Sequence, residues 1–135
     1  TLSGNPVAVA TGAAMLRGAT PAVYEHLPRV AHQIADGLSE ALAAEGVAHT
    51  VAWAGSQFSI FFRETAPQNY AEAQAQEVFR FGPYFHAMLE NGVSLPPSIY
   101  EAWFVSAAHD DAAVERVLGA AVPAARAAAR AVPAR

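Results

Sequence analysis

The sequence predicts an α+β fold, in which a small, mostly antiparallel sheet has helices packed on one side. Two observations carry this expectation. Long stretches with apolar residues at helical spacing are bounded by helix-capping residues, and short alternating or aromatic-rich runs lie between them. The order is helix, helix, hairpin, helix, two short strands and helix. Because many unrelated domains share this order, the order alone selects no function.

The first helix is expected over residues 6–17. Asn5 is a favourable N-cap residue, Pro6 suits the first helical position, and Gly18 follows the last turn. The helix is apolar on nearly all sides, so it needs cover on more than one face.

The start of this helix also suits an anion such as phosphate. N–H groups of a first helical turn and the helix dipole attract negative charge, and the hydroxyls of Thr1 and Ser3 are further donors. An ordinary capped helix start is the commoner use of such a sequence, and both interpretations stay open on the residues alone.

The second helix is expected from Pro21, after Thr20 as N-cap, to about residue 45, with Gly46 as its end. Pro28 inside it is a candidate kink. The core-facing stripe at helical spacing consists of Val23, Leu27, Val30, Ile34, Leu38 and Leu42.

A β-hairpin is expected next. Residues 49–54 alternate in polarity, residues 57–63 place Phe58, Ile60 and Phe62 on one face, and the turn 55–56 joins them.

Residues 64–70 are expected to form a loop and residues 71–91 a third helix, interrupted at Gly82 and Pro83 and closed by Gly92. Short strands at 93–95 and 103–106 are expected on either side of a proline-braced loop.

The last helix is expected to start at Asp110 and Asp111, which complement the helix dipole, and to run towards Ala131, with fraying beyond Pro133.

Composition excludes several classes of function. The length of 135 residues is typical of one domain. The net charge of −4 gives no indication of a basic surface for nucleic acid. There is no cysteine, no apolar run long enough for a membrane span and no signal peptide. The five histidines show no metal-ligand spacing, so no metal site is expected. The sequence starts abruptly within a motif and without Met, so we expect the chain to be a piece of a larger protein.

Several motifs, in order, resemble one enzyme family. They are the segments 1–6 (TLSGNP), 55–58 (GSQF), 85–90 (FHAMLE) and 92–106 (GVSLPPSIYEAWFVS). The chain is similar over essentially its whole length, least so after Leu118, to the glutamate-1-semialdehyde 2,1-aminomutase family. That family belongs to the class III aminotransferase-like, fold-type I enzymes that use pyridoxal 5'-phosphate.

The resemblance implies a C-terminal part, with residues 1–18 leading from the cofactor domain and residues 19–135 forming the small domain. It implies a cytoplasmic homodimer that converts glutamate 1-semialdehyde to 5-aminolevulinate for tetrapyrrole synthesis. In that family the threonine matching Thr1 reaches across the dimer interface to the cofactor phosphate. The Schiff-base lysine lies upstream, and this chain has no lysine, so we expect it to be inactive alone.

The resemblance also gives Glu101 a role. The matching glutamate lies near the active site, where related aminotransferases carry an arginine for the substrate α-carboxylate. A carboxylate there would repel ordinary α-amino acids, whereas arginine would bind them. A structural ion pair is the alternative for Glu101. Two other identities stay open, the small domain of another class III aminotransferase and a non-enzymatic dimerisation module.

Overall fold

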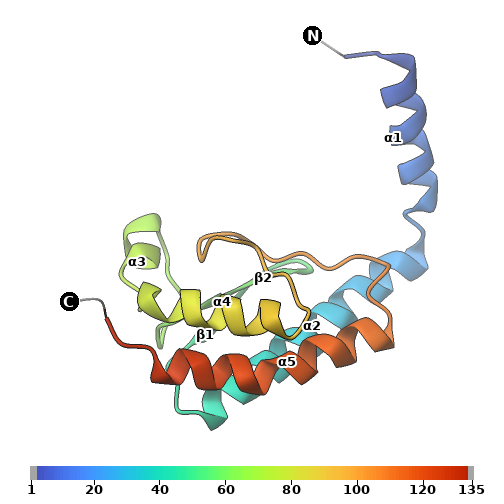
Figure 1. The fold of residues 1–135 in the computed structure, drawn as a ribbon. Coiled ribbons are helices and arrows are strands. Elements are labelled where there is room, and N and C mark those ends of the chain that lie inside the picture. Colours follow the sequence, from blue (N-terminus) through green and yellow to red (C-terminus); the bar gives the residue numbers. More distant parts are fainter. Residues whose placement is uncertain (1–2, 134–135) are drawn as a thin grey trace.

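The computed structural model describes residues 3–133. Helices α2 (Pro21–Ala44), α4 (Phe81–Glu90) and α5 (Asp111–Arg130) pack together, with α5 against both of the others (Figure 1). A two-stranded antiparallel sheet, β1 (Thr50–Ala54) and β2 (Gln57–Phe61), lies against α2. The remaining elements are α1 (Pro6–Gly18), the short α3 (Tyr70–Gln74) and a single 3-10 turn, η1 (Val78–Arg80). The α+β fold is confirmed, with a smaller sheet than the sequence predicts.

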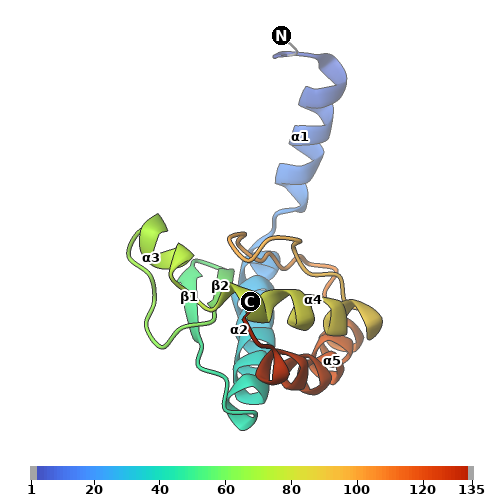
Figure 2. The ribbon, with the colours of Figure 1, turned by 60° about the vertical axis from the view of Figure 1, so that its left-hand side comes forward.

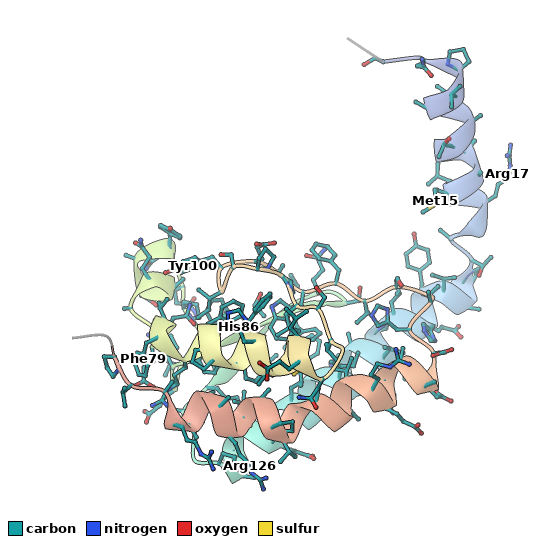
Figure 3. The ribbon with its side chains drawn as sticks, in the orientation of Figure 1. Met15, Arg17, Phe79, His86, Tyr100 and Arg126 are labelled. Atoms are coloured by element: carbon teal, nitrogen blue, oxygen red, sulfur yellow. The ribbon has the colours of Figure 1, made fainter. Side chains whose placement is uncertain are left out.

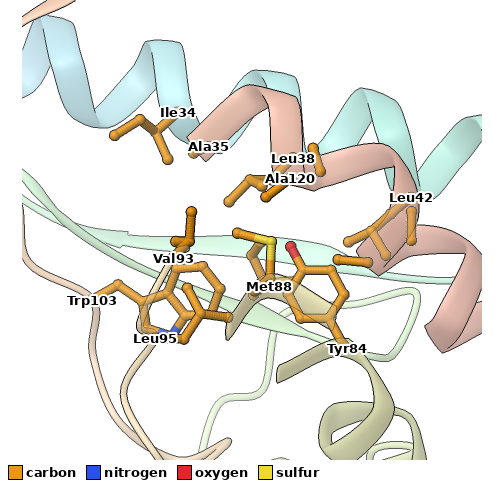
Figure 4. Packing of buried hydrophobic residues seen from close by; sticks show 14 of the residues in the cluster. Ile34, Ala35, Leu38, Leu42, Tyr84, Met88, Val93, Leu95, Trp103 and Ala120 are labelled. Atoms are coloured by element: carbon orange, nitrogen blue, oxygen red, sulfur yellow. The ribbon is translucent and has the colours of Figure 1, made fainter. Parts of the chain in front are cut away.

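The core lies between α2, α4, α5 and the inner face of the hairpin. Leu38 and Leu42 of α2 face Tyr84 and Met88 of α4 (Figure 4), and all four side chains are essentially inaccessible to water. Helix α5 contributes small side chains that let the backbones approach closely. They are Ala120, Ala121, Ala124, Ala125 and Ala128. The burial of apolar surface between these layers is the main stabilising contribution.

Local signals located most of the long elements correctly. Asn5 caps α1, with its side-chain oxygen accepting from Val7 and Ala8 N–H at 3.0 and 3.2 Å. Asp110 caps α5 by accepting from Ala113 N–H at 2.9 Å. Helix α2 runs unbroken through Pro28. The hairpin pairs as predicted, with Trp53 opposite Phe58.

The expected third helix over residues 71–91 is wrong as one element. It is divided into α3, η1 and α4, and the break falls at residues 75–77. Pro83 lies in the first turn of α4, where a backbone N–H has no helical partner, so it interrupts nothing. Gln76 makes the break favourable, because its buried side chain accepts from Phe62 N–H at 3.1 Å and donates to Ala73 O at 2.8 Å.

The two short strands expected at 93–95 and 103–106 do not form. Gly92 ends α4 with a φ of +82°, as expected, and Val93 and Leu95 then enter the core without strand pairing. Trp103 makes one isolated antiparallel bridge, to Phe58. Apolar residues here fill the core from loops, and apolar sequence alone could not distinguish the two arrangements.

Helix α1 stands away from the rest of the molecule in both views (Figures 1 and 2), and none of its residues is buried. Its apolar side chains are exposed, with Met15 72% and Leu16 78% accessible. Among residues 3–133, no helix has the length and apolar character needed to cross a bilayer.

Candidate functional site

The backbone of Glu101 is held on a loop between two buried residues. Ile99 and Trp103, on either side of it, are 5% and 7% accessible, whereas Glu101 itself is exposed. The Glu101 N–H donates to Ser98 O at 3.2 Å, and the Ser59 hydroxyl donates to Glu101 O at 3.3 Å. The main chain at Glu101 is therefore fixed by the core and by strand β2.

The carboxylate of Glu101 is left unengaged by these contacts. The ion pairs found within residues 3–133 join Glu77 to Arg80 and Glu45 to Arg126, and neither involves Glu101. The structural ion pair considered for Glu101 is thus absent from the described part of the chain. A charged group that is free of partners and stands on a fixed backbone is suited to acting on a charge outside this domain.

Exposed aromatic side chains surround this loop. Tyr100, labelled in Figure 3, pairs with Tyr70 at the start of α3, with the ring centroids 5.8 Å apart. Phe104 is 68% accessible on the far side of the bridge at Trp103. Both tyrosines remain largely exposed, with Tyr70 64% and Tyr100 43% accessible.

The N-terminal anion site receives no support from α1. Its first-turn N–H groups are not free, because Asn5 Oδ1 accepts from Val7 and Ala8, and Val9 N–H donates to Asn5 O at 2.9 Å. Pro6 has no N–H to offer. These contacts are those of an ordinary capped helix start, which is the alternative to the anion interpretation. Thr1 lies outside the described residues.

Four of the five histidines, His26, His32, His49 and His109, make hydrogen bonds with ring nitrogens. His49 Nδ1 donates to Val47 O at 2.8 Å, and its Nε2 lies 2.7 Å from the Ser39 hydroxyl. His26 Nε2 lies 3.1 Å from the His109 carbonyl, connecting α2 to the start of α5. Across residues 3–133, no cluster of three or more His, Asp or Glu side chains is placed to hold a metal ion.

Two apolar hollows lie elsewhere on the molecule, and Glu101 lines neither of them. An apolar one of about 320 Å³ lies between α2 and the loops that precede α5, with Leu38, Trp103 and Phe104 in its wall. Another of about 330 Å³ lies where α1 leaves the body, between Met15, Leu27 and Val105. Both are lined mainly by apolar side chains, so they could hold an apolar group but supply few polar groups for catalysis.

Comparison with known proteins gives close relatives for this arrangement. The chain is 51% identical over 128 residues to the glutamate-1-semialdehyde 2,1-aminomutases of two strains of Tropheryma whipplei, Twist and TW08/27. The match covers 95% of this chain and 28% of each relative, so the chain spans just over a quarter of the relatives' length. No family model matches the chain.

A solved structure with the same fold is that of an omega-transaminase from Sphaerobacter thermophilus. It superposes with a TM-score of 0.83 at 27% sequence identity, over 95% of this chain and 29% of that one. The chain is therefore homologous to a part of the glutamate-1-semialdehyde aminomutases, and its α+β architecture is that of a transaminase part.

Proposed function

We propose that this chain is the C-terminal part of a glutamate-1-semialdehyde 2,1-aminomutase, a cytoplasmic homodimer that makes 5-aminolevulinate for tetrapyrrole synthesis. The observation that carries the proposal is the 51% identity to two such enzymes over 95% of the chain. The division into a segment 1–18 leading from a cofactor domain and a small domain 19–135 agrees with the isolation of α1 from the packed helices.

The cofactor of the complete enzyme would be pyridoxal 5'-phosphate, which supplies an electron sink and a carrier for the migrating amino group. This chain has no lysine, so the Schiff-base lysine must come from the rest of the protein and this part is inactive alone. Thr1 is the one residue of the chain proposed to contact the cofactor, at its phosphate. Among the described residues, the N–H groups of Val7 and Ala8 are taken by the Asn5 side chain.

Glu101 is proposed to select the substrate by charge. Its carboxylate is exposed, has no ion pair within residues 3–133 and stands on an anchored backbone. Glutamate 1-semialdehyde carries an aldehyde where an ordinary α-amino acid carries its α-carboxylate. A fixed negative charge at that place disfavours the ordinary amino acid and leaves the aldehyde substrate unaffected.

Helix α1 is proposed to pack against the remainder of the enzyme and its partner subunit. Apolar side chains exposed on several sides, such as Val7, Met15 and Leu16, are typical of surfaces covered in the complete assembly. The apolar hollow between Met15 and Val105 extends this surface onto the body of the domain.

The test is a hybrid enzyme in which this chain replaces the matching part of the Tropheryma whipplei aminomutase. With pyridoxal phosphate and glutamate 1-semialdehyde, we expect it to form 5-aminolevulinate without an added amino donor. A folded hybrid with no turnover under these conditions would contradict the proposal. The hybrid with its Schiff-base lysine replaced by alanine is the matched inactive control.

A second candidate is a part of another class III aminotransferase, which the likeness to an omega-transaminase favours. The same hybrid separates the two. An intermolecular aminotransferase part would support transfer only when an external amino donor and a separate acceptor are both supplied. Failure of every such reaction in a folded, cofactor-loaded hybrid would favour a non-enzymatic module.

A further inference from the structure

The loop that carries Glu101 pairs with strand β2 at a single residue pair and does not continue as a strand. Trp103 and Phe58 exchange two backbone hydrogen bonds, with N···O distances of 2.7 and 3.3 Å. In an antiparallel ladder with this register, the next hydrogen-bonded pair would be Glu101 with Ile60. No hydrogen bond joins those two residues in the described structure.

Continuing the ladder would put Glu101 on the wrong face. Residues two apart on a strand share a face of the sheet, and Trp103 points into the core at 7% accessibility. A strand through Glu101 would therefore direct its carboxylate towards the apolar interior. The cost of desolvating that charge exceeds the gain from one more pair of backbone hydrogen bonds.

Two contacts replace the missing pair. The Glu101 N–H turns back along the chain to Ser98 O, and the Glu101 carbonyl accepts from the hydroxyl of Ser59. Ser59 lies on β2 between the buried residues Phe58 and Ile60, so its side chain is on the opposite face of the strand. It is the only side chain within residues 3–133 that hydrogen-bonds to the Glu101 backbone.

We propose that Ser59 is a positioning residue for Glu101. Desolvation keeps the carboxylate out of the core, and the Ser59 hydroxyl, by holding the Glu101 carbonyl, fixes the position from which the outward carboxylate acts. The proposal rests on the selectivity role of Glu101 proposed above. Ser59 itself contacts neither substrate nor cofactor in this scheme; it acts through the direction that Glu101 takes.

The experiment uses the hybrid enzyme and measures two rates. One is amino transfer to the cofactor from glutamate, an ordinary α-amino acid, followed by cofactor absorbance. The other is formation of 5-aminolevulinate. Ser59→Ala removes one neutral hydrogen bond, so we expect the ratio of the first rate to the second to rise about 2- to 10-fold.

Four further variants make the result specific. Ser59→Thr keeps the hydroxyl and should keep the ratio of the parent. Ser56→Ala, in the hairpin turn, removes a hydroxyl for which the described part of the chain shows no hydrogen bond, and it should change nothing. Glu101→Gln should raise the ratio at least as far as Ser59→Ala, and the double variant Ser59→Ala/Glu101→Gln should show no further rise.

The outcomes separate the two proposals. A changed ratio in Glu101→Gln with an unchanged ratio in Ser59→Ala would overturn the positioning role and leave the role of Glu101 standing. An unchanged ratio in Glu101→Gln would overturn both. If Ser59→Ala lowered the melting temperature and slowed both reactions equally, Ser59 would be a scaffold residue and the proposal would be wrong.

Discussion

Helices α1 and α2 are neighbours in the chain but differ in burial, because α2 packs into the core and α1 does not. Each begins with a proline after a capping residue, and only Ala19 and Thr20 separate them. Helix α2 buries six residues along one stripe, whereas α1 buries none. Apolar content therefore does not decide whether a helix is covered within its own domain. A stripe on one face indicates a partner in the same layer, while apolar residues all round indicate cover supplied from elsewhere.

The two helices also depend on their caps differently. Thr20 makes no side-chain hydrogen bond to α2, yet that helix is held by packing along its length. Helix α1 has 13 residues and no buried side chain, a length that is marginal for an isolated helix in water. Asn5 is thus a large part of what holds α1 in the absence of a partner.

The largest test of this contrast is a matched pair of leucine truncations. Leu38 in α2 is 1% accessible and Leu16 in α1 is 78% accessible. We expect Leu38→Ala to lower the free energy of unfolding by about 2–5 kcal/mol, because a cavity is left in the core. Leu16→Ala should stay within about 0.5 kcal/mol of the parent chain. Urea unfolding measures both, and similar losses would mean that α1 is packed against the domain.

Removing a helix cap should lower the free energy of unfolding by less than Leu38→Ala does. Asp110→Ala removes the acceptor for Ala113 N–H at the start of the packed helix α5, so the free energy of unfolding should fall by about 0.5–2 kcal/mol. Asn5→Ala should leave the unfolding midpoint unchanged and lower helical circular dichroism, because α1 melts on its own. A midpoint shifted by Asn5→Ala would contradict the independence of α1.

A buried hydroxyl in the packed region gives a still smaller effect. Tyr84 is 1% accessible, and its hydroxyl has no hydrogen-bond partner among residues 3–133. Tyr84→Phe should raise the free energy of unfolding by up to about 1 kcal/mol, since an unpaired polar group leaves the core. Tyr100→Phe, on the exposed loop, is the control and should be neutral.

The same tyrosine predicts a pH dependence. Burial raises the pKa of Tyr84 above its ordinary value, so the folded state keeps the phenol proton when the unfolded chain has lost it. Stability should therefore fall as the pH rises above about 10, the unperturbed pKa of tyrosine. Tyr84→Phe should show a shallower loss. Equal slopes for the two proteins would mean that Tyr84 ionises freely in the folded state.

The parts of the fold that sequence predicted well are those decided locally. Asn5, Asp110 and Gly92 act within one turn of their own position, and the hairpin register follows from the alternation around Gly55. The two strands that the sequence predicts and that do not form depend on contacts with distant parts of the chain. The Glu101 carbonyl accepts a hydrogen bond from Ser59, 42 residues away, and no local sequence pattern predicts this contact.

The candidate site divides in the same way. Glu101 was identified by resemblance to a family and not by its own neighbourhood, where one carboxylate in a loop is ordinary. Ser59 was missed because only its contact with Glu101 makes it notable; strand alternation did place it on the face opposite Phe58 and Ile60. The break at Gln76 was missed because a buried glutamine side chain, rather than a glycine or proline, interrupts the helix.

The smallest effect on stability is expected from adding charge to α1, and it tests what that helix is for. Leu16→Glu places a carboxylate on an exposed apolar position, so the free energy of unfolding should change by less than about 0.5 kcal/mol. Self-association and binding of a hydrophobic dye should both fall, since exposed apolar patches drive them.

Thr11→Glu adds the same charge at an exposed polar position of α1 and is the control. Sedimentation velocity and dye fluorescence measure the two properties. A parent chain that is strictly monomeric and binds no dye would show that α1 needs no neighbour, and so would equal effects of the two variants.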